Sequence, residues 1–504
     1  MLSPSASSKT QKPESLPGSF SYEQLQKIWR VSAREDLAFF LEYDSRGQWQ
    51  RARHLELLCR KLEEVERGKL RRLMVFMPPR HGKSEIVSKK FPAWYIGRHP
   101  DREVIISSYS ADLAFDFSRI ARNTLREHGP DVFGVQVARD TSAVGRWGIE
   151  GHRGGLTASG VGGPITGRGA HVAIIDDPVK NAEEAASEVI RERVWDWYRS
   201  TLYTRLAPGG AIVLVMTRWH EDDLAGRLLR EMENGGEQWE VISLPALAEE
   251  NDPLGRAPGE PLWPERFPKS ELLNIQRTLG SYLWAALYQQ RPQPVEGGLF
   301  KRTYFRYFRR EGEYYLVGDK RIYEKDCWRF SVVDPAISTK DTADYFVMQT
   351  WAITPYADML LLDVVRERID GPEQLELIRQ QYDRWCPAYI GVEKVAFQSM
   401  LIQMLLMKGL PVRELKPDKD KFTRALPLAA KYEAGKVYHL AGAGWVDEYE
   451  AELLAFPNGA HDDQVDAAAY AALEIAVPKT PVVTKNPLPF ALRTDTQRGG
   501  YFEW

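Results

Sequence analysis

Two groups of residues in this sequence have the types and the spacing that phosphate chemistry requires. The first group begins with Gly82, Lys83 and Ser84, which follow the apolar run at 73–77 and are predicted to open a helix. In that position backbone N–H groups bind nucleotide phosphates, Lys83 reaches the β and γ oxygens, and Ser84 holds Mg²⁺. The complete pattern has a glycine where this chain has Met77, so the tripeptide alone is a weak signal.

The same group continues with two acids at the end of another apolar run. Asp176 and Asp177 follow Ala-Ile-Ile at 173–175. Asp176 is placed to hold a metal ion through water, and Asp177 to polarise the attacking water. For this segment alone, a solvated Asp-Asp turn is an equal alternative. Together with Lys83, the two acids predict a site of ATP hydrolysis.

Three further polar residues are candidates for this site. Thr217 ends the apolar run at 211–216, where it either senses hydrolysis near the γ-phosphate or simply terminates a strand. Hydrolysis also needs a cation on the transition-state charge. Arg80, in the loop before Gly82, and Arg168, just before the acidic strand, are the two candidates, and the sequence does not choose between them.

The second group is a set of acids that end strands or open a helix. Asp334 follows Phe-Ser-Val-Val, and Glu393 follows Tyr-Ile-Gly-Val. Asp463 and Asp466 lie at the start of the last predicted helix, three residues apart, and therefore face the same way. Hard Mg²⁺ or Mn²⁺ ions take oxygen ligands, and two ions about 4 Å apart need several carboxylates from different elements. The set therefore predicts a carboxylate metal site.

Three neighbouring features are open to more than one interpretation. Asp462 lies beside these acids but is better explained as the N-cap of the last helix. Asp344, at the start of a predicted strand, is either a supporting ligand or a turn residue. The stretch from Lys408 to Arg424 carries six bases and three acids, an excess of +3 that fits either a DNA-binding surface or a solvated loop.

The elements that must position these residues fall into two regions. The first is helical from about Tyr22 to Gly68, with apolar residues recurring at spacings of three and four near its end. These residues are Leu55, Leu58, Leu62 and Val65. Apolar runs then alternate with helical stretches, at 73–77, 103–110, 171–177, 211–217 and 239–244. Such strands, separated by helices, predict a parallel sheet covered on both faces.

The second region has a different order of elements. Residues 251–298 are rich in Pro and Gly and predict a linker with one short helix. Three strands follow from about Trp328, then a helix, a strand, a helix and a strand. This order predicts a mixed sheet rather than a doubly wound one.

Composition narrows the class of protein. The 504 residues are 43% hydrophobic and 27% charged, which excludes a disordered chain. Three widely separated cysteines favour neither a disulfide framework nor a Cys-rich zinc site. A net charge of -3 argues against a histone-like binder. Because no apolar stretch reaches about 18 residues and no signal peptide is evident, we expect a soluble intracellular protein.

Taken in order, these motifs resemble those of the terminase large subunit of tailed double-stranded DNA bacteriophages, the packaging motor and nuclease. The resemblance covers about residues 50 to 475 and rests on the segments PPRHGKS, TGRGAHVAIIDD, VMTRWH, QQRP, VVDPA, GVEK and HDDQVDA. It implies an α/β fold, with a P-loop ATPase of parallel sheet and helices on both faces, followed by an RNase H-like mixed-sheet nuclease domain. The implied segments are a leader and helical arm at 1–50, the motor at 51–250, a linker and lid at 251–298, the nuclease at 299–478 and a tail at 479–504.

The resemblance also implies a role for each candidate residue. The ATP contacts are Arg80, Gly82, Lys83, Ser84, Asp176 and Thr217, with Ser84 and Asp176 on Mg²⁺. Asp177 becomes the catalytic carboxylate, although family members often have Glu there. Arg80 or Arg168 becomes the arginine finger, Arg168 on a neighbouring subunit's ATP. The nuclease ligands for two Mg²⁺ or Mn²⁺ ions are Asp334, Glu393 and Asp463, with Asp466 as an alternative or addition.

The implied partners follow from the same family. They are double-stranded DNA, the portal protein, the small terminase subunit and further copies of this chain in a ring, expected to be a pentamer, with no membrane. The implied location is the host cytoplasm, with transient docking on the procapsid. Two alternatives stay open at this stage: a helicase-nuclease of DNA repair, and an ATP-driven remodelling or scaffold protein with an inactive nuclease-like domain.

Overall fold

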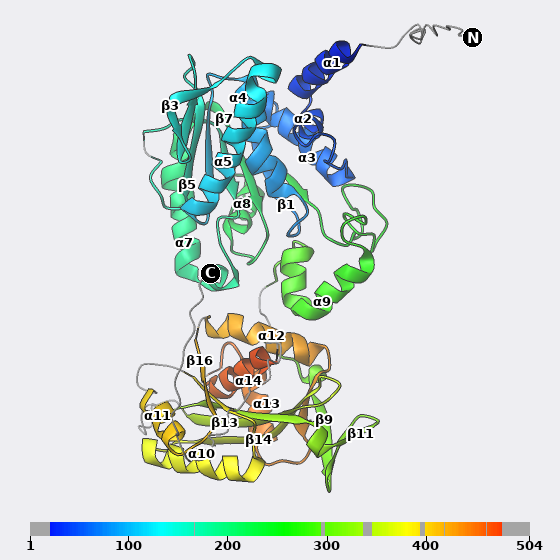
Figure 1. The fold of residues 1–504 in the computed structure, drawn as a ribbon, viewed down its shortest axis with the longest axis vertical. Helices are drawn as coiled ribbons and strands as arrows, with labels where there is room; N and C mark the ends of the chain where they lie inside the picture. The colour runs from blue at the N-terminus through cyan, green and yellow to red at the C-terminus, as the bar shows by residue number, and fades with distance from the viewer. Residues whose placement is uncertain are drawn as a thin grey trace, which may run out of the picture.

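The structure of the chain divides into two α/β bodies. The computed structural model describes residues 21–165, 167–293, 298–335, 345–393, 399–417, 419–459 and 461–475. One body is built on an eight-stranded sheet and the other on a nine-stranded sheet. Figure 1 shows them one above the other, with helix α9 (Lys269–Leu283) between them. None of the described helices is long and apolar enough to cross a membrane.

Three helices precede the first sheet. They are α1 (Tyr22–Glu35), α2 (Leu37–Asp44) and α3 (Arg53–Glu66). The apolar face predicted for α3 is buried in the core beside the sheet, and it consists of Leu55, Leu58, Leu62 and Val65. The amphipathic helix predicted before the first strand is therefore confirmed.

The eight strands of the first sheet lie in the order β3-β4-β5-β2-β6-β7-β1-β8. They are β1 (Arg72–Phe76), β2 (Glu103–Ser108), β3 (Val137–Ala143), β4 (Arg146–Ile149), β5 (Gly155–Gly160), β6 (Ala170–Asp176), β7 (Leu206–Met216) and β8 (Glu240–Ser243). From β5 to β8 in this spatial order, all neighbouring pairs are parallel. This confirms the parallel pairing predicted for the five apolar runs that form β2, β6, β7, β1 and β8, whereas β5 was not predicted. The antiparallel pairs at the β3 edge were not predicted, because these short strands lack a long apolar run.

Both faces of the first sheet are covered. Successive residues of β1 point to opposite sides, so that Leu73 and Val75 lie in one core and Met74 and Phe76 in another. A π-helical turn at Glu85–Lys90 follows β1 and leads into the first of the covering helices. These helices are α4 (Phe91–Arg98), α5 (Ala111–His128), α6 (Ala182–Ala186), α7 (Glu188–Trp197) and α8 (Leu224–Glu233).

The second sheet is mixed, with the order β11-β10-β9-β17-β14-β13-β12-β15-β16. Its strands are β9 (Arg306–Glu311), β10 (Tyr314–Val317), β11 (Lys320–Tyr323), β12 (Trp328–Asp334), β13 (Phe346–Ile353), β14 (Met359–Glu367), β15 (Ile390–Glu393), β16 (Val412–Leu415) and β17 (Val437–Leu440). The three strands predicted from Trp328 onwards, β12 to β14, are neighbours as expected. The hairpin strands β9 to β11 and the short β17 were missed.

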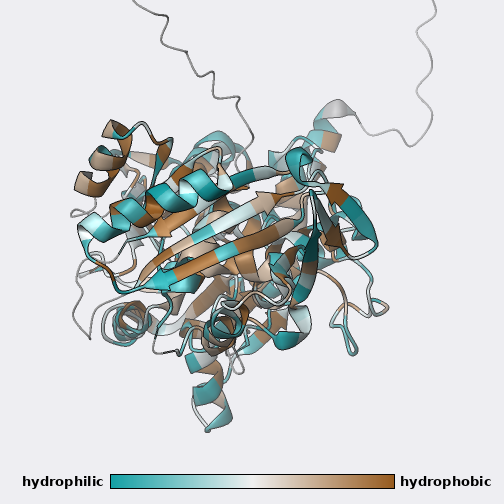
Figure 2. Cartoon of the chain, turned by 90° about the horizontal axis from the view of Figure 1, so that it is seen from below, coloured by the Kyte–Doolittle hydropathy of each residue, from teal (hydrophilic) through white to brown (hydrophobic). Residues whose placement is uncertain are grey.

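Helices pack on both sides of this sheet. They are α10 (Gly371–Trp385), α11 (Ser399–Met407), α12 (Lys421–Glu433), α13 (Val446–Ala455) and α14 (Asp463–Glu474). Seen from below in Figure 2, hydrophobic strands run behind helices that carry hydrophilic residues. In Figure 1, α12 lies on the side of this body that faces the first body.

Helix α9 connects the two bodies and is longer than the short helix predicted for the linker. It has 15 residues and a kink at Gly280, whose φ of 74° favours glycine. A Cβ atom at this position would lie 3.1 Å from the Cβ of Ala430 on α12. The backbone N–H of Ser281 donates to the Glu433 carboxylate at 2.8 Å, which fixes the kink to α12.

Candidate active sites

A cavity of about 830 Å³ opens where β1, β6 and β7 end. These strands are parallel neighbours, so their carboxyl ends share one edge of the sheet. The predicted motor residues that line the cavity are Arg80, Gly82, Lys83, Ser84, Asp176, Asp177 and Thr217. The sheet order therefore brings together residues that are far apart in the sequence.

The loop after β1 has the backbone that phosphate binding requires. Gly82 has φ of 92°, and a Cβ atom there would lie 2.8 Å from the Leu55 side chain. Arg80 has φ of 65° and is exposed at the cavity. Met77, which replaces the expected glycine, is buried, and its carbonyl oxygen accepts from Lys83 Nζ at 3.4 Å. The residue at this position therefore packs in the core rather than shaping the loop.

Lys83, Asp177 and Thr217 contact one another. Lys83 Nζ lies 3.5 Å from Asp177 Oδ2 and donates to the Thr217 hydroxyl. The backbone N–H of Thr217 donates to Asp177 Oδ1 at 2.6 Å. Because β7 lies between β6 and β1, Thr217 contacts both the lysine and the acid. Thr217 therefore links the lysine that follows β1 to the acid that follows β6.

Two serines hold Asp176. Ser84 Oγ donates to Asp176 Oδ1 at 3.0 Å, and Ser88 Oγ donates to the other carboxylate oxygen. Asp176 is 1% exposed, and burial, followed by repulsion from Asp177, raises its pKa. Sequence reasoning missed Ser88, although its position four residues after Ser84 places it on the same side of a helical segment.

We expect Ser88→Ala to lower ATP hydrolysis mainly by raising the Mg²⁺ concentration needed for half-maximal rate. The substitution removes one of the two hydroxyls that orient Asp176, and outer partners of metal-binding groups change affinity by about tenfold. Titration of the rate with Mg²⁺ at saturating ATP measures the effect. Ser118→Ala, at another buried serine of the same body, is the matched control and should leave the Mg²⁺ dependence unchanged. An unchanged dependence in Ser88→Ala contradicts the assignment.

The two candidate arginines lie in different places. Arg80 reaches the cavity, but Arg168 precedes β6, whereas Asp176 ends that strand. At about 3.3 Å per residue, the length of β6 separates Arg168 from the acid by about 20 Å. Arg168 therefore does not line this cavity of its own chain.

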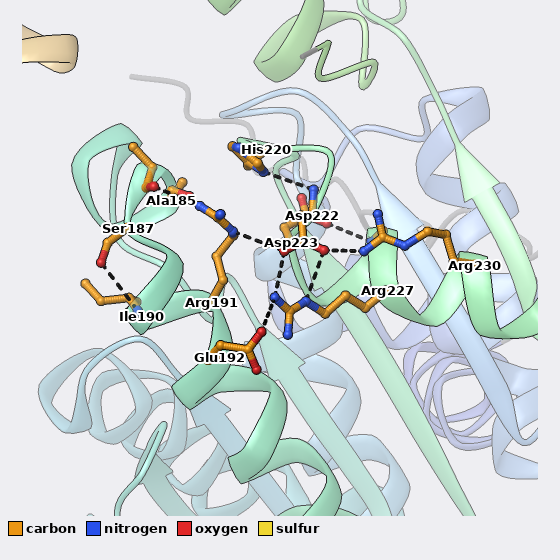
Figure 3. A network of polar contacts seen from close by, with 12 residues as sticks. Ala185, Ser187, Ile190, Arg191, Glu192, His220, Asp222, Asp223, Arg227 and Arg230 are labelled. Atoms are coloured by element: carbon orange, nitrogen blue, oxygen red, sulfur yellow. Dashed lines mark hydrogen bonds and ion pairs between the residues drawn. The ribbon is translucent and has the colours of Figure 1, made fainter. Parts of the chain in front are cut away.

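The loop after Thr217 is held by a polar network that Figure 3 shows in close view. Asp222 binds Arg191 of α7 and Arg227 of α8, with distances of 3.3 and 2.6 Å, and also contacts Arg230. Burial opposes ionisation of Asp222, but the hydrogen bonds from Arg227 and Arg230 lower its pKa to about 2. The network ties this loop to the two helices on that face of the sheet.

Aromatic residues of the linker pack on the phosphate-binding loop. The His81 ring stacks on the Phe267 ring with 4.5 Å between the ring centroids. The ring of His54, in α3, lies edge-on to Trp263 with 5.2 Å between the ring centroids. Burial lowers the pKa of both histidines to about 4, so they are neutral at pH 7. Trp263 and Arg266 also line the cavity. Residues 251–298 were expected to form a linker and lid, with no cavity residue predicted among them.

The second candidate site is a cluster of carboxylates at the end of β12. Asp334 ends β12 and Glu393 ends its parallel neighbour β15, while α14 supplies Asp463 and Asp466. Burial, followed by repulsion from Glu393, Asp466 and Asp463, raises the pKa of Asp334. The four predicted acids therefore lie within electrostatic reach of one another.

Two cations and a hydroxyl from nearby helices hold this cluster. Arg424 of α12 lies 3.0 Å from Asp466 and 3.5 Å from Glu393. Lys421 lies 3.1 Å from the second oxygen of Asp466. The Tyr470 hydroxyl donates to Glu393 at 2.8 Å. The sequence did not reveal these partners.

The donor set suits a hard divalent ion, because it consists of carboxylate oxygens whose negative charges repel one another. In the conformation described, however, no three His, Cys, Asp or Glu side chains among the described residues are close enough together to hold a metal ion. Arg424 of α12 contacts both Glu393 and Asp466 and so lies between them. Asp344, the possible supporting ligand, lies outside the described residues.

Asp462 does not cap α14 with its side chain, although it occupies the N-cap position. Its carboxylate binds Lys421 at 2.5 Å instead. Glu452 of α13 caps the helix, accepting from the backbone N–H groups of Gln464 and Val465 at 2.7 and 3.2 Å. The predicted N-cap position of Asp462 is confirmed, but its side chain does not cap the helix, because a buried glutamate from another helix satisfies these donors.

The basic stretch is only partly available to DNA. Lys421 and Arg424 bind the acids of the cluster, and Arg413 binds Glu474 at 2.6 Å. The remaining bases, Lys408, Lys416 and Lys419, are exposed. The charge excess predicted from this stretch therefore splits between the carboxylate cluster and the surface.

Comparison with known families assigns both bodies. The family model described as terminase large subunit, T4likevirus-type, N-terminal, matches residues 74–306. The model described as terminase RNaseH-like domain matches residues 332–474. The chain belongs to the terminase large subunit family. It is thus an ATPase and nuclease of bacteriophage DNA packaging rather than a repair helicase or a scaffold protein.

Solved structures of large terminases are similar to this terminase at low sequence identity. One large terminase from a thermophilic bacteriophage is 12% identical, with a TM-score of 0.46 over 83% of this chain and 99% of that one. The magnesium-bound nuclease of the thermophilic phage G20c is 16% identical, with a TM-score of 0.27 over 36% and 99%. The large terminase of bacteriophage HK97 is 10% identical, with a TM-score of 0.30 over 73% and 81%. No curated protein matches this sequence.

Proposed function

We propose that this terminase hydrolyses ATP in the cavity at the edge of the first sheet and cuts DNA at the carboxylate cluster of the second. The observation that carries the first half is the mutual contact of Lys83, Asp177 and Thr217. The convergence of Asp334 and Glu393 with the start of α14 supports the second half. The motor then spans about residues 51–250, the linker 251–298 and the nuclease 299–478.

In the motor, each residue has a separate task. The loop around Gly82 binds the phosphates, and Lys83 neutralises the β and γ oxygens. Ser84 and Asp176 hold Mg²⁺, which supplies charge that stabilises the transferring phosphoryl group. Asp177 orients the attacking water and accepts its proton. Thr217 contacts both Lys83 and Asp177 and transmits the loss of the γ-phosphate on hydrolysis to the loop that Asp222 fixes.

In the nuclease, Asp334, Glu393 and Asp463 hold two Mg²⁺ or Mn²⁺ ions, with Asp466 as a further ligand. Ions held by these acids would supply the charge that activates water and stabilises the leaving oxygen of a phosphodiester. Glu452 fixes the start of α14 and so the direction of the two aspartates. The exposed bases Lys408, Lys416 and Lys419 contact the DNA backbone.

The family assignment also supports an assembly of several copies with other proteins. Copies of the chain form a ring, most simply a pentamer, on the portal of a procapsid in the host cytoplasm, and a small terminase subunit selects the DNA. Arg168 lies at the opposite end of β6 from Asp176, so it is too far from the nucleotide of its own chain. In a ring it instead acts as an arginine finger on the nucleotide of the neighbouring subunit. Arg80 then serves the nucleotide of its own chain.

Mixing inactive subunits tests this arrangement. We expect Arg168→Ala and Lys83→Ala to be inactive alone, and an equal mixture with procapsids to recover about a quarter of the wild-type ATPase rate. Recovery arises where a Lys83→Ala subunit supplies Arg168 to an intact nucleotide site. An Arg80→Ala and Lys83→Ala mixture is the matched control and should stay inactive, because both residues serve one site. Failure of the first mixture to recover activity rules out the role in trans.

A further inference from the structure

Both carboxylate oxygens of Asp466 are engaged by cations of the same helix. Arg424 Nη2 lies 3.0 Å from Oδ1, and Lys421 Nζ lies 3.1 Å from Oδ2. The two bases are three residues apart in the first turn of α12 and therefore project the same way. A divalent ion that binds Asp466 therefore competes with two cations for the same two oxygens.

The two cations differ in freedom. Arg424 is 4% exposed, and its guanidinium also contacts Glu393 and packs 4.4 Å from the centre of the Tyr470 ring. The Lys421 side chain is 53% exposed, and it reaches the cluster from the solvent side, where it also binds Asp462. Arg424 is therefore fixed, whereas Lys421 can leave by rotating into solvent.

The charges explain why such cations are present. The four carboxylates Asp334, Glu393, Asp463 and Asp466 lie within electrostatic reach of one another, and burying uncompensated charges is costly. Lys421 and Arg424 supply two positive charges against these acids in the absence of metal. The same positive charges repel an incoming divalent ion and compete with it for oxygen atoms.

We propose that Lys421 and Arg424 are resident counter-ions that hold the nuclease site assembled but unloaded, and that metal binding displaces Lys421 from Asp466. This inference rests on the proposed function of the cluster as a metal site. The two counter-ions give the nuclease a weak affinity for metal in its resting state. A packaging enzyme benefits from such a state, because DNA must stay intact while the motor moves it.

Calorimetric titration of the nucleotide-free, full-length chain with Mn²⁺ tests the proposal. We expect Lys421→Met to bind Mn²⁺ about tenfold more tightly than wild type, as removal of one unit charge beside a divalent ion at a half-exposed position would give. Arg424→Gln, which keeps hydrogen-bonding groups without the charge, should also bind more tightly, and its metal-free form should melt at a lower temperature. Arg413→Met is the matched control, because Arg413 is a similarly exposed base that binds an acid of α14, Glu474, outside the cluster.

The outcomes separate this inference from the proposed function. Asp334→Asn should remove the Mn²⁺ binding that wild type shows, and its persistence would mean that the cluster is not the metal site. If wild type and Asp334→Asn differ as expected but Lys421→Met binds Mn²⁺ no more tightly than wild type, the counter-ion role is wrong. If Arg413→Met tightens binding equally, the effect is one of general surface charge and the proposal also fails.

Discussion

Lys83→Ala abolishes ATP hydrolysis, with an expected loss of at least about a hundredfold in rate, the scale for removal of one preorganised group that stabilises transition-state charge. Lys83 is 5% exposed, and its ammonium group contacts both Asp177 and Thr217 at the cavity. Its loss also leaves Asp177 without this ion pair. Release of inorganic phosphate from Mg²⁺-ATP measures the rate.

The control for this substitution is another paired lysine. Lys61 binds Glu240 and Glu64 on the surface of the same body, at 2.9 and 3.2 Å, and does not line the cavity. Lys61→Ala should therefore hydrolyse ATP at nearly the wild-type rate. Substantial hydrolysis by Lys83→Ala would place the nucleotide elsewhere and remove the basis for assigning Ser84, Asp176 and Thr217.

Asp334→Asn abolishes metal-dependent DNA cutting, with a loss of at least about a hundredfold expected when a metal-binding oxygen is made neutral. Asparagine has nearly the same shape, so the fold should persist. The variant should also be more stable than wild type in metal-free buffer, because the ionised Asp334 is repelled by Glu393, Asp466 and Asp463. Conversion of supercoiled plasmid and thermal unfolding in EDTA measure the two effects.

This combination of lost activity and gained stability separates a site residue from a scaffold residue. Asp319→Asn, in the exposed turn between β10 and β11, is the control and should change neither plasmid cutting nor melting temperature. Retained cutting by Asp334→Asn would show that the carboxylate cluster is not the nuclease site. A lower melting temperature would show that Asp334 is stabilised rather than repelled by its neighbours.

Much of the sheet arrangement could be predicted because parallel strands carry their polar residues at one edge. Asp176, Thr217, Asp334 and Glu393 each end an apolar run, and the structure places each pair of strands side by side. The same reasoning could have placed Arg168 correctly, since it precedes the strand that Asp176 ends. Strands β3 and β4 form a local hairpin but were missed because they lack a long apolar run. Strand β17 was missed because it pairs with the distant strands β14 and β9 rather than with a sequence neighbour.

The partners of the nuclease acids could not be predicted from the sequence. Whether Lys421 and Arg424 face the solvent or the acids depends on how α12 is rotated against α14, and helical periodicity does not give that orientation. Glu452 replaced Asp462 as the cap of α14 because α13 and α14 pack together, which is again a tertiary effect. Basic residues from one stretch of sequence therefore lie in two different environments, the carboxylate cluster and the exposed surface.

We propose that one chain holds two independent centres of phosphate chemistry. The most direct test measures ATP hydrolysis and plasmid cutting on the same preparations of Lys83→Ala and Asp334→Asn. The structure predicts that Lys83→Ala cuts plasmid but does not hydrolyse ATP, and that Asp334→Asn hydrolyses ATP but does not cut. Loss of both activities in either variant would contradict the separation of the two sites.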